Sequence, residues 1–288
     1  MPMNPPPNLQ RHLPFKLEAL LQIVSRAGAE TLNWWQKPLT VTDKADASPV
    51  TAADLAAHQI IVDGLQRLTP DIPVLSEEDA DIPLAQRQHW QRFWLVDPLD
   101  GTKEFIAGTD EFTVNIALIE RGQVRFGVVG IPARNSLFWG GKGLGAWRSQ
   151  DKQPAQIIQC RTAGEPLVVV ASRRHTSPEQ EALLAKLEAQ GNVERINVGS
   201  SLKFCLLAEG RADLYPRYAP TCQWDTGAAQ AVLEGAGGQV LGLDGQRFSY
   251  PQRETWLNPH FIAVGDAPAL MAALELGALD TDAGASAS

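Results

Sequence analysis

The chain has 288 residues, of which 44% are hydrophobic and 20% are charged, a composition that fits a globular protein and argues against a disordered one. Its 33 acidic residues outnumber its 25 basic residues, and the net charge of −8 argues against a broad nucleic-acid-binding or anionic-membrane surface. No apolar run approaches the roughly 18 residues that a membrane span requires, and three cysteines without CxxC spacing argue against disulfide frameworks and zinc knuckles.

The first half of the chain predicts two helices followed by a series of strands. Residues 1–13 begin with a proline-rich stretch and predict a flexible lead-in. Apolar residues at helical spacing predict one helix over 14–35 and another over 51–69. Short apolar runs separated by turn residues predict strands over 73–76, 93–96, 112–119, 124–131, 136–140 and 142–147.

The second half alternates strands with helices, which favours a layered α/β lobe. The predicted strands are 167–171, 193–198, 212–215 and 239–243. The predicted helices are 178–189, 200–208 and 224–234. A composition shift near 149–154 divides the two patterns. We therefore predict an α/β protein with an α+β N-terminal lobe over 14–150, an α/β C-terminal lobe over 151–279 and a disordered tail over 280–288.

Four acidic residues stand at the ends of apolar segments, where a strand or helix terminus can hold a carboxylate rigidly. They are Glu77, Asp97, Asp100 and Asp225. In the string Asp-Pro-Leu-Asp-Gly-Thr, Pro98 stiffens the turn. Asp97 and Asp100 can then converge on one site, together with the Leu99 carbonyl. Oxygen ligands of this kind suit hard divalent cations, Mg²⁺ above all.

The same turn also suits a bound phosphate. Gly101 lets the backbone approach a ligand closely, and a helix beginning near 103–105 would turn the amides of Gly101 and Thr102 into an anion site. Taken one at a time, these features have ordinary alternatives. Asp-Gly is a common turn, an aspartate such as Asp225 commonly caps a helix, and Glu77 begins a run of three acids that could be a solvated loop.

Four segments, taken together and in this order, resemble the inositol monophosphatase superfamily of Mg²⁺-dependent phosphatases, and the resemblance covers residues 17–264. The segments are 46–54 (DASPVTAAD), 75–79 (LSEED), 94–105 (WLVDPLDGTKEF) and 224–229 (WDTGAA). Within the superfamily, three features are most similar to the bacterial CysQ group of 3′(2′),5′-bisphosphate nucleotidases. They are 103–105 (KEF), 199–205 (GSSLKFC) and 214–217 (LYPR). Where the family usually reads Ala-Ala-Gly after Trp-Asp-Thr, this chain has Gly-Ala-Ala, and we expect only a minor change in packing.

The resemblance implies a layered αβαβα fold of the sugar-phosphatase type and a site for two or three Mg²⁺ ions. One ion would be held by Glu77, Asp97 and the Leu99 carbonyl. A second would be held by Asp97, Asp100 and Asp225. Clustered carboxylates repel one another, so the ions should relieve strain in the site. Two ions a few ångströms apart would stabilise the attacking and leaving oxygens of an in-line displacement.

The resemblance also implies water as the nucleophile, oriented by Thr102 and an upstream aspartate, Asp54. Without the resemblance, Asp54 would be interpreted as a charge on a helix surface. The predicted substrate-binding residues are Glu77, Leu99, Asp100, Gly101, Thr102, Lys103, His175, Ser200, Lys203, Arg217 and Asp225. Among these, Lys203 and Arg217 would hold the phosphate that is not cleaved. The alternative is an exposed helix lysine and a surface arginine, with His175 as a cap at a strand end.

The implied activity is that of a Mg²⁺-dependent phosphoric monoester hydrolase, a 3′(2′),5′-bisphosphate nucleotidase. It would convert adenosine 3′,5′-bisphosphate to AMP, supporting sulfate assimilation. The sulfated analogue, which would give adenosine 5′-phosphosulfate, is a second candidate substrate. The alternatives are an inositol or sugar monophosphatase of the same fold and a non-catalytic sensor of phosphorylated nucleotides. The presence of all four acids together with Thr102 argues against the sensor.

The expected partner is a small nucleoside bisphosphate, with no nucleic acid involved, and the oligomeric state is left open. The first residues lack a charged-then-apolar signal pattern, so we expect a cytoplasmic protein without a transmembrane segment. Some members of the superfamily associate loosely with the cytoplasmic face of the inner membrane, and the resemblance leaves that association open for this chain.

Overall fold

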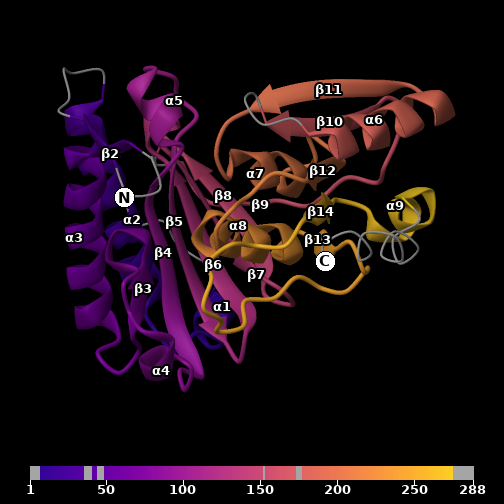
Figure 1. Ribbon diagram of the computed structural model, residues 1–288. Helices are drawn as coiled ribbons and strands as arrows, with labels where there is room; N and C mark the ends of the chain where they lie inside the picture. Colours follow the sequence, from indigo (N-terminus) through magenta and orange to yellow (C-terminus); the bar gives the residue numbers. More distant parts are fainter. Residues whose placement is uncertain (1–6, 36–40, 44–48, 152, 173–176, 275–288) are drawn as a thin grey trace.

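Helices and sheets alternate in layers from one side of the molecule to the other (Figure 1). The computed structural model describes residues 7–35, 41–43, 49–151, 153–172 and 177–274. The order of layers is a helix pair, a seven-stranded sheet, a second helix pair, a five-stranded sheet and an outer helix pair. The helix pairs are α2 (Leu17–Trp34) with α3 (Ala52–Leu68), α7 (Leu202–Ala208) with α8 (Gln223–Gly235), and α6 (Pro178–Gln190) with α9 (Ala267–Leu274). The predicted αβαβα arrangement is confirmed.

The larger sheet belongs mainly to the first half of the chain and is antiparallel except for its first pair of strands, β3 and β4. Its strands, in spatial order, are β3 (Val74–Ser76), β4 (Arg92–Asp100), β5 (Thr113–Glu120), β6 (Gln123–Ile131), β7 (Ser136–Gly141), β8 (Gly145–Gln150) and β9 (Gln156–Ile157). One face packs on the apolar sides of α2 and α3, and the other packs on α8. A separate short pair, β1 (Val41–Asp43) and β2 (Pro49–Thr51), is antiparallel.

Glycines allow α8 to lie directly on the larger sheet. A Cβ atom at Gly127 of β6 would come within 2.3 Å of the carbonyl oxygen of Ala228, a distance that no side chain could accept. Gly227 of α8 also faces a narrow space, because a Cβ atom at that position would lie 3.0 Å from the Leu95 side chain. The exchange of small residues after Trp-Asp-Thr therefore places a glycine where helix and sheet approach closely. The start of α8, which carries Asp225, is held against the sheet by this contact.

The smaller sheet contains one strand that the sequence did not reveal. Its spatial order is β11 (Val193–Val198), β10 (Leu167–Ser172), β12 (Leu214–Arg217), β14 (Phe261–Val264) and β13 (Gln239–Gly242). β10 is parallel to both of its neighbours, whereas β14 is antiparallel to β12 and to β13. The predicted series ended at 239–243, but β14 follows it in sequence and lies between two earlier strands. Four consecutive apolar residues at 261–264 are its only local signal.

Other elements refine the predicted boundaries. β4 does not stop at residue 96 but continues to Asp100, with an irregular register against β5 between Asp97 and Asp100. The helix predicted from residue 200 begins at 202, because Ser200 has a φ of +48°. Within the predicted lead-in, α1 (Pro7–Gln10) is helical and Leu9 is buried. β9 pairs with β8, so the first sheet extends past the predicted lobe boundary.

The tail predicted over 280–288 lies outside the described residues. Cys160, Cys205 and Cys222 are free thiols. Within the ranges that the structure describes, no helix combines the length and the apolar character needed to cross a bilayer.

Candidate active site

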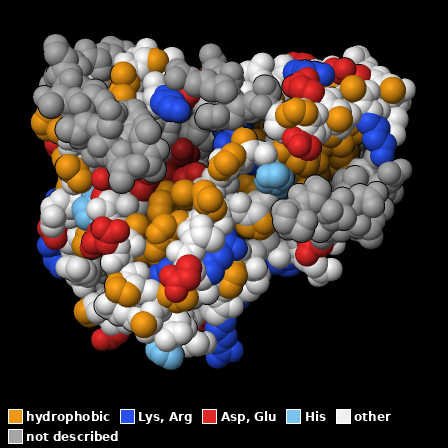
Figure 2. Space-filling view, viewed as in Figure 1, with side chains coloured by type: hydrophobic (Ala, Val, Ile, Leu, Met, Phe, Trp, Pro, Cys, Tyr) orange, Lys and Arg blue, Asp and Glu red, His pale blue; other side chains and the backbone are white. Residues whose placement is uncertain are grey.

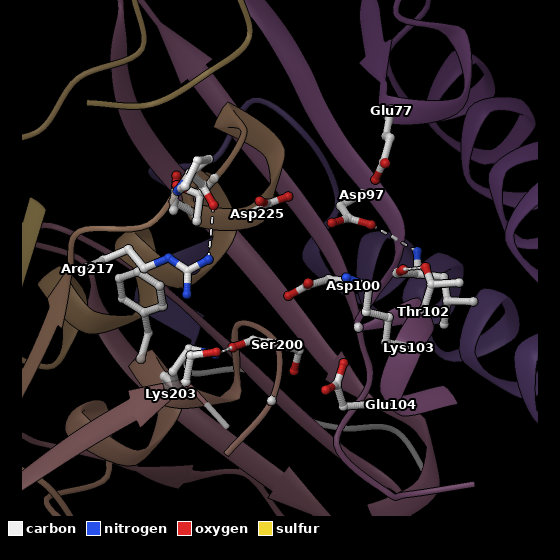
Figure 3. Close-up of a pocket in the computed structure, with 18 of the residues that line it drawn as sticks. Glu77, Asp97, Asp100, Thr102, Lys103, Glu104, Ser200, Lys203, Arg217 and Asp225 are labelled. Carbon is white, nitrogen blue, oxygen red and sulfur yellow. Dashed lines mark hydrogen bonds between the residues drawn. The ribbon is translucent and has the colours of Figure 1, made fainter. Parts of the chain in front are cut away.

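A pocket of about 250 Å³ is lined by residues 77–104 of the first half of the chain and 172–226 of the second half, and it gathers most of the predicted site residues (Figure 3). Those that line it are Glu77, Asp97, Leu99, Asp100, Gly101, Thr102, Lys103, Ser200, Lys203, Arg217 and Asp225. Side chains that were not predicted also line it, including Glu104, Tyr215 and Thr221. Acidic side chains are visible within a hollow of the face drawn in Figure 2. His175 lies outside the described residues.

The acidic residues reach the pocket from the ends of separate elements. Glu77 opens the short 3₁₀ helix η1 (Glu77–Asp79), directly after β3. Asp97 and Asp100 occupy the last part of β4, and Asp225 lies in the first turn of α8. Carboxylate oxygens of the three aspartates lie within 4.8 Å of one another. The sequence prediction that these acids converge is therefore matched by the geometry.

Burial and mutual repulsion make this cluster electrostatically costly. Burial, together with the negative charges of Glu77, Asp100, Asp225 and Asp54, raises the pKa of Asp97 well above the usual carboxylate range. The pKa of Asp225 is raised for the same reasons, with burial first. A set of buried, oxygen-only donors that repel one another suits a hard divalent cation, because the cation would compensate the charge that the protein leaves uncompensated.

Backbone amides orient the three aspartates. The Leu99 amide donates to Asp97 Oδ1 at 3.1 Å, and the Cys222 amide donates to Asp225 Oδ2 at 2.8 Å. The Ser201 amide donates to Asp100 Oδ2 at 2.5 Å. Ser201 lies 101 residues further along the chain, so the orientation of Asp100 depends on a long-range contact.

The turn after β4 lies in close contact with the segment around Ser200. Gly101 has a φ of +88°, which favours glycine, and a Cβ there would lie 3.3 Å from the Cβ of Ser200. The helix predicted near 103 is α5 (Thr102–Ile106). The Thr102 hydroxyl donates to the Leu99 carbonyl at 3.2 Å. Asp54, near the start of α3, is 2% exposed, so the alternative of a surface charge is wrong.

Two positively charged side chains, Lys203 and Arg217, lie across the pocket from Asp97 (Figure 3). Both are buried, so the alternative of an exposed helix lysine and a surface arginine is wrong. Lys203 Nζ donates to the carbonyl oxygens of Ser200 at 2.6 Å and of Val198 at 3.4 Å. Burial lowers the pKa of Lys203 to about 8, although the charge of Asp100 opposes that shift. Arg217 donates from Nε and Nη2 to the carbonyls at 219 and 220.

A buried polar network behind Asp100 was missed by the sequence reasoning. The Thr113 hydroxyl lies 3.4 Å from Asp100 Oδ2 and 2.8 Å from the Ser201 hydroxyl. The Ser201 hydroxyl donates to Asn115 Oδ1 at 2.7 Å. The one sign of this network in the sequence was Asn115, a polar residue within the apolar run of β5. The role of Ser201 was not visible, because its partners lie more than 80 residues away.

Comparison with known proteins gives consistent matches over most of the chain. A model of the inositol monophosphatase family matches residues 16–273. The 3′(2′),5′-bisphosphate nucleotidase CysQ of Escherichia coli K12 is 50% identical over 247 residues, which are 85% of this chain and 98% of that protein. CysQ of Haemophilus influenzae is 36% identical over 259 residues, covering 90% and 94% of the two chains.

Solved structures agree with these sequence matches. The crystal structure of CysQ from Bacteroides thetaiotaomicron has a TM-score of 0.75 at 38% identity, covering 86% of this chain and 96% of that one. An inositol monophosphatase from Zymomonas mobilis has a TM-score of 0.70 at 25% identity, covering 91% and 96%.

The repulsion within the acidic cluster predicts an unusual effect of Asp97→Asn. In protein stripped of divalent cations, this variant should melt at a higher temperature than wild type, because one of the repelling buried charges is removed. It should also lose most of the rise in melting temperature that Mg²⁺ gives wild type; a ligand at 100 times its Kd stabilises by about 2.7 kcal/mol. Thermal unfolding with EDTA and with excess Mg²⁺ measures both effects.

Asp71→Asn, at an exposed acid outside the pocket, is the matched control and should behave as wild type.

The sign of the pH dependence provides a second check. Because the folded-state pKa of Asp97 lies above its unfolded value, the cation-free protein should gain stability as the pH falls through that raised pKa. A wild-type melting temperature indifferent to Mg²⁺, or an Asp97→Asn variant less stable than wild type in EDTA, would contradict the assignment.

Proposed function

The chain belongs to the inositol monophosphatase family, and we propose that within this family it is a 3′(2′),5′-bisphosphate nucleotidase acting on adenosine 3′,5′-bisphosphate. The observation that carries the proposal is that one pocket has two oppositely charged walls. The acidic wall consists of Glu77, Asp97, Asp100 and Asp225, and the basic wall consists of Lys203 and Arg217. It is supported by 50% identity to proteins named as such nucleotidases, over nearly their whole length. The chain is therefore a phosphatase, and its substrate is a phosphate ester.

The two walls suit a substrate that carries two phosphates. The scissile phosphate would lie at the acidic wall, where its negative charge requires cations between it and the carboxylates. Lys203 and Arg217 would face the second phosphate at the opposite wall, since charge-assisted hydrogen bonds are the strong ones for phosphate. An inositol monophosphate has no second phosphate for that wall. This difference favours the bisphosphate over the inositol phosphatase alternative.

The cations that we propose are Mg²⁺, in two sites. Glu77, Asp97 and the Leu99 carbonyl would form one site, and Asp97, Asp100 and Asp225 the other. When bound, the ions would stabilise the attacking and leaving oxygens of an in-line displacement. The backbone amides that hold one oxygen of each aspartate leave the second oxygen of each for the pocket.

Thr102 and Asp54 would orient the attacking water. The Thr102 hydroxyl lines the pocket and keeps its lone pairs for a hydrogen bond from water, while its proton points to the Leu99 carbonyl. In the proposed relay that proton turns to the Asp54 carboxylate, which is buried and close enough to influence the pKa of Asp97. The water oxygen would then bond to phosphorus as the bond to the 3′ oxygen breaks. One water proton would pass through the Thr102 hydroxyl to Asp54, the other would stay on the released phosphate, and the leaving 3′ oxygen would take a proton from solvent water.

A substrate panel tests the function directly. Phosphate release is measured with and without Mg²⁺ on adenosine 3′,5′-bisphosphate, its sulfated analogue, AMP, inositol 1-phosphate and a sugar phosphate. The bisphosphate should exceed the monophosphates in kcat/KM by about tenfold or more, as one charge-assisted contact permits. A preference for inositol 1-phosphate would favour the runner-up, and tight binding without hydrolysis would favour the sensor.

Removing the Thr102 hydroxyl tests the relay. Thr102→Ala should lower kcat by about 10²–10⁴-fold, while the effect of Mg²⁺ on the melting temperature persists, because the hydroxyl carries no charge. Thr102→Ser keeps the hydroxyl and should retain most activity. Asp54→Asn should resemble Thr102→Ala, and the double variant should lose little more than either single one. Independent, multiplicative losses would show that the two side chains do not act together.

Lys203→Met tests which phosphate the basic wall recognises. The methionine keeps the buried stem and removes the ammonium, so kcat/KM on the bisphosphate should fall roughly 10–100-fold. The loss on inositol 1-phosphate should be small, because that substrate lacks the second phosphate. Lys142→Met, at an exposed lysine outside the pocket, is the control. Equal losses on both substrates would mean that Lys203 supports the loop at 198–200 and not the second phosphate.

A further inference from the structure

Arg87, the last residue of α4 (Leu84–Arg87), is an arginine with only 2% of its surface exposed, and it does not line the pocket. Its Nε donates to the carbonyl of Ile82 at 3.0 Å. Its Nη1 donates to Gln252 Oε1 at 2.8 Å, and its Nη2 donates to the carbonyl of Arg253 at 2.7 Å. The guanidinium also lies 3.9 Å from the centre of the Trp256 ring. A single planar group thus joins segments about 165 residues apart.

The loop that Arg87 grips, 251–258, also holds the start of α8. The Gln223 amide donates to the carbonyl of Trp256 at 3.0 Å, and the Asn258 side chain donates to the carbonyl of Cys222 at 2.6 Å. The Trp256 ring packs on that of Trp224, with centroids 5.7 Å apart. Cys222 is the residue whose amide fixes Asp225 Oδ2. The loop therefore holds the backbone that orients one acidic side chain of the pocket.

The other contact of Arg87 reaches back toward Glu77. Ile82 lies in the segment that leaves η1, three residues after that short helix ends. Ala80 and Ile82 pack against the same apolar core as Cys222 and Trp256. Arg87 accordingly contacts both the segment that follows Glu77 and the loop that holds Asp225.

We propose that Arg87 is a positioning residue for the cation site, which ties the segment bearing Glu77 to the loop that holds Asp225. The inference rests on the proposed function only in assuming that these acids bind Mg²⁺. Glu77 and Asp225 repel each other while no cation is bound. The hydrogen bonds of Arg87 to Ile82 and Arg253 oppose their separation. Without the contacts of Arg87, part of the free energy of Mg²⁺ binding would be used to bring Glu77 and Asp225 together. The apparent affinity for Mg²⁺ would fall by the corresponding factor.

The test measures Mg²⁺ binding by calorimetry on the full chain without substrate. Residues that orient metal ligands typically contribute about 10–100-fold to affinity. Arg87 acts through a loop, so Arg87→Lys should raise the Kd about three- to tenfold, since an ammonium cannot reproduce the planar fork. Arg87→Met should raise it further. At saturating Mg²⁺, kcat of Arg87→Lys should recover to near wild type, because Arg87 touches no reacting atom.

Arg247→Lys is the matched control. Arg247 is a partly buried arginine that binds Glu234 at the other end of α8, with Nε at 2.9 Å from Oε1. This variant should lower the melting temperature but leave the Mg²⁺ Kd within about twofold, since Glu234 lies about two and a half helical turns from Asp225. Equal rises in Kd for the Arg87 and Arg247 variants would mean general destabilisation and would overturn the proposal.

An unchanged Kd in a folded Arg87→Lys variant would also overturn it. If Arg87→Met does not fold, Gln252→Ala removes one partner of the guanidinium from the loop and should raise the Kd in the same direction, by less. No change in either folded variant would reject the role. Wild-type protein that binds no Mg²⁺ would reject the proposed cation site itself, an outcome distinct from failure of the Arg87 inference.

Discussion

The constraint on which the rest of the site depends is the repulsion among carboxylates that the fold gathers at the pocket, where Asp97 is buried and Asp100 and Asp225 are half-buried. Asp97, Asp100 and Asp225 offer oxygens within 4.8 Å of one another, and burial strengthens the interaction between their charges. Such a cluster costs free energy in a protein without a bound cation. It persists because backbone amides hold one oxygen of each aspartate and because the elements that carry the acids are packed rigidly.

That rigidity comes from the packing of elements of the second half of the chain against the larger sheet. α8 carries Asp225 and lies on the larger sheet at a distance that only glycine permits at Gly127. The second lobe supplies the Ser201 amide to Asp100, and the polar network through Thr113 and Asn115 continues that contact into β5. The aspartates are therefore oriented by backbone from both halves of the chain, at residues 99, 201 and 222.

In the function that we propose, Lys203 and Arg217 on the opposite wall select the kind of phosphate ester that fits. Lys203 and Arg217 are held by backbone carbonyls, so they are positively charged groups placed in the pocket before any ligand arrives. Preorganised charge of this kind favours a ligand with a second negative group at a set distance from the first. A phosphatase for inositol or sugar monophosphates would gain little from burying two cations there, which is why the basic wall separates the functions that the shared fold leaves open.

Local interactions account for what the sequence by itself determined. The long helices α2 and α3, most strands of the larger sheet and the turn from Asp97 to Thr102 were predictable, because apolar periodicity and turn chemistry act over a few residues. The convergence of Asp97 and Asp100 was expected from the turn between them, and that of Glu77 and Asp225 only from the family resemblance. Oxygens of the three aspartates lie within 4.8 Å of one another, and Glu77 lines the same pocket. Only the tertiary structure decided features that depend on distant partners. β14 lies between two strands that precede it in sequence, β12 and β13, and the burial of Lys203 depends on the segments packed around it. Ser201 and Arg87 act through residues roughly 100 and 165 positions away, and no local pattern records a contact of that range.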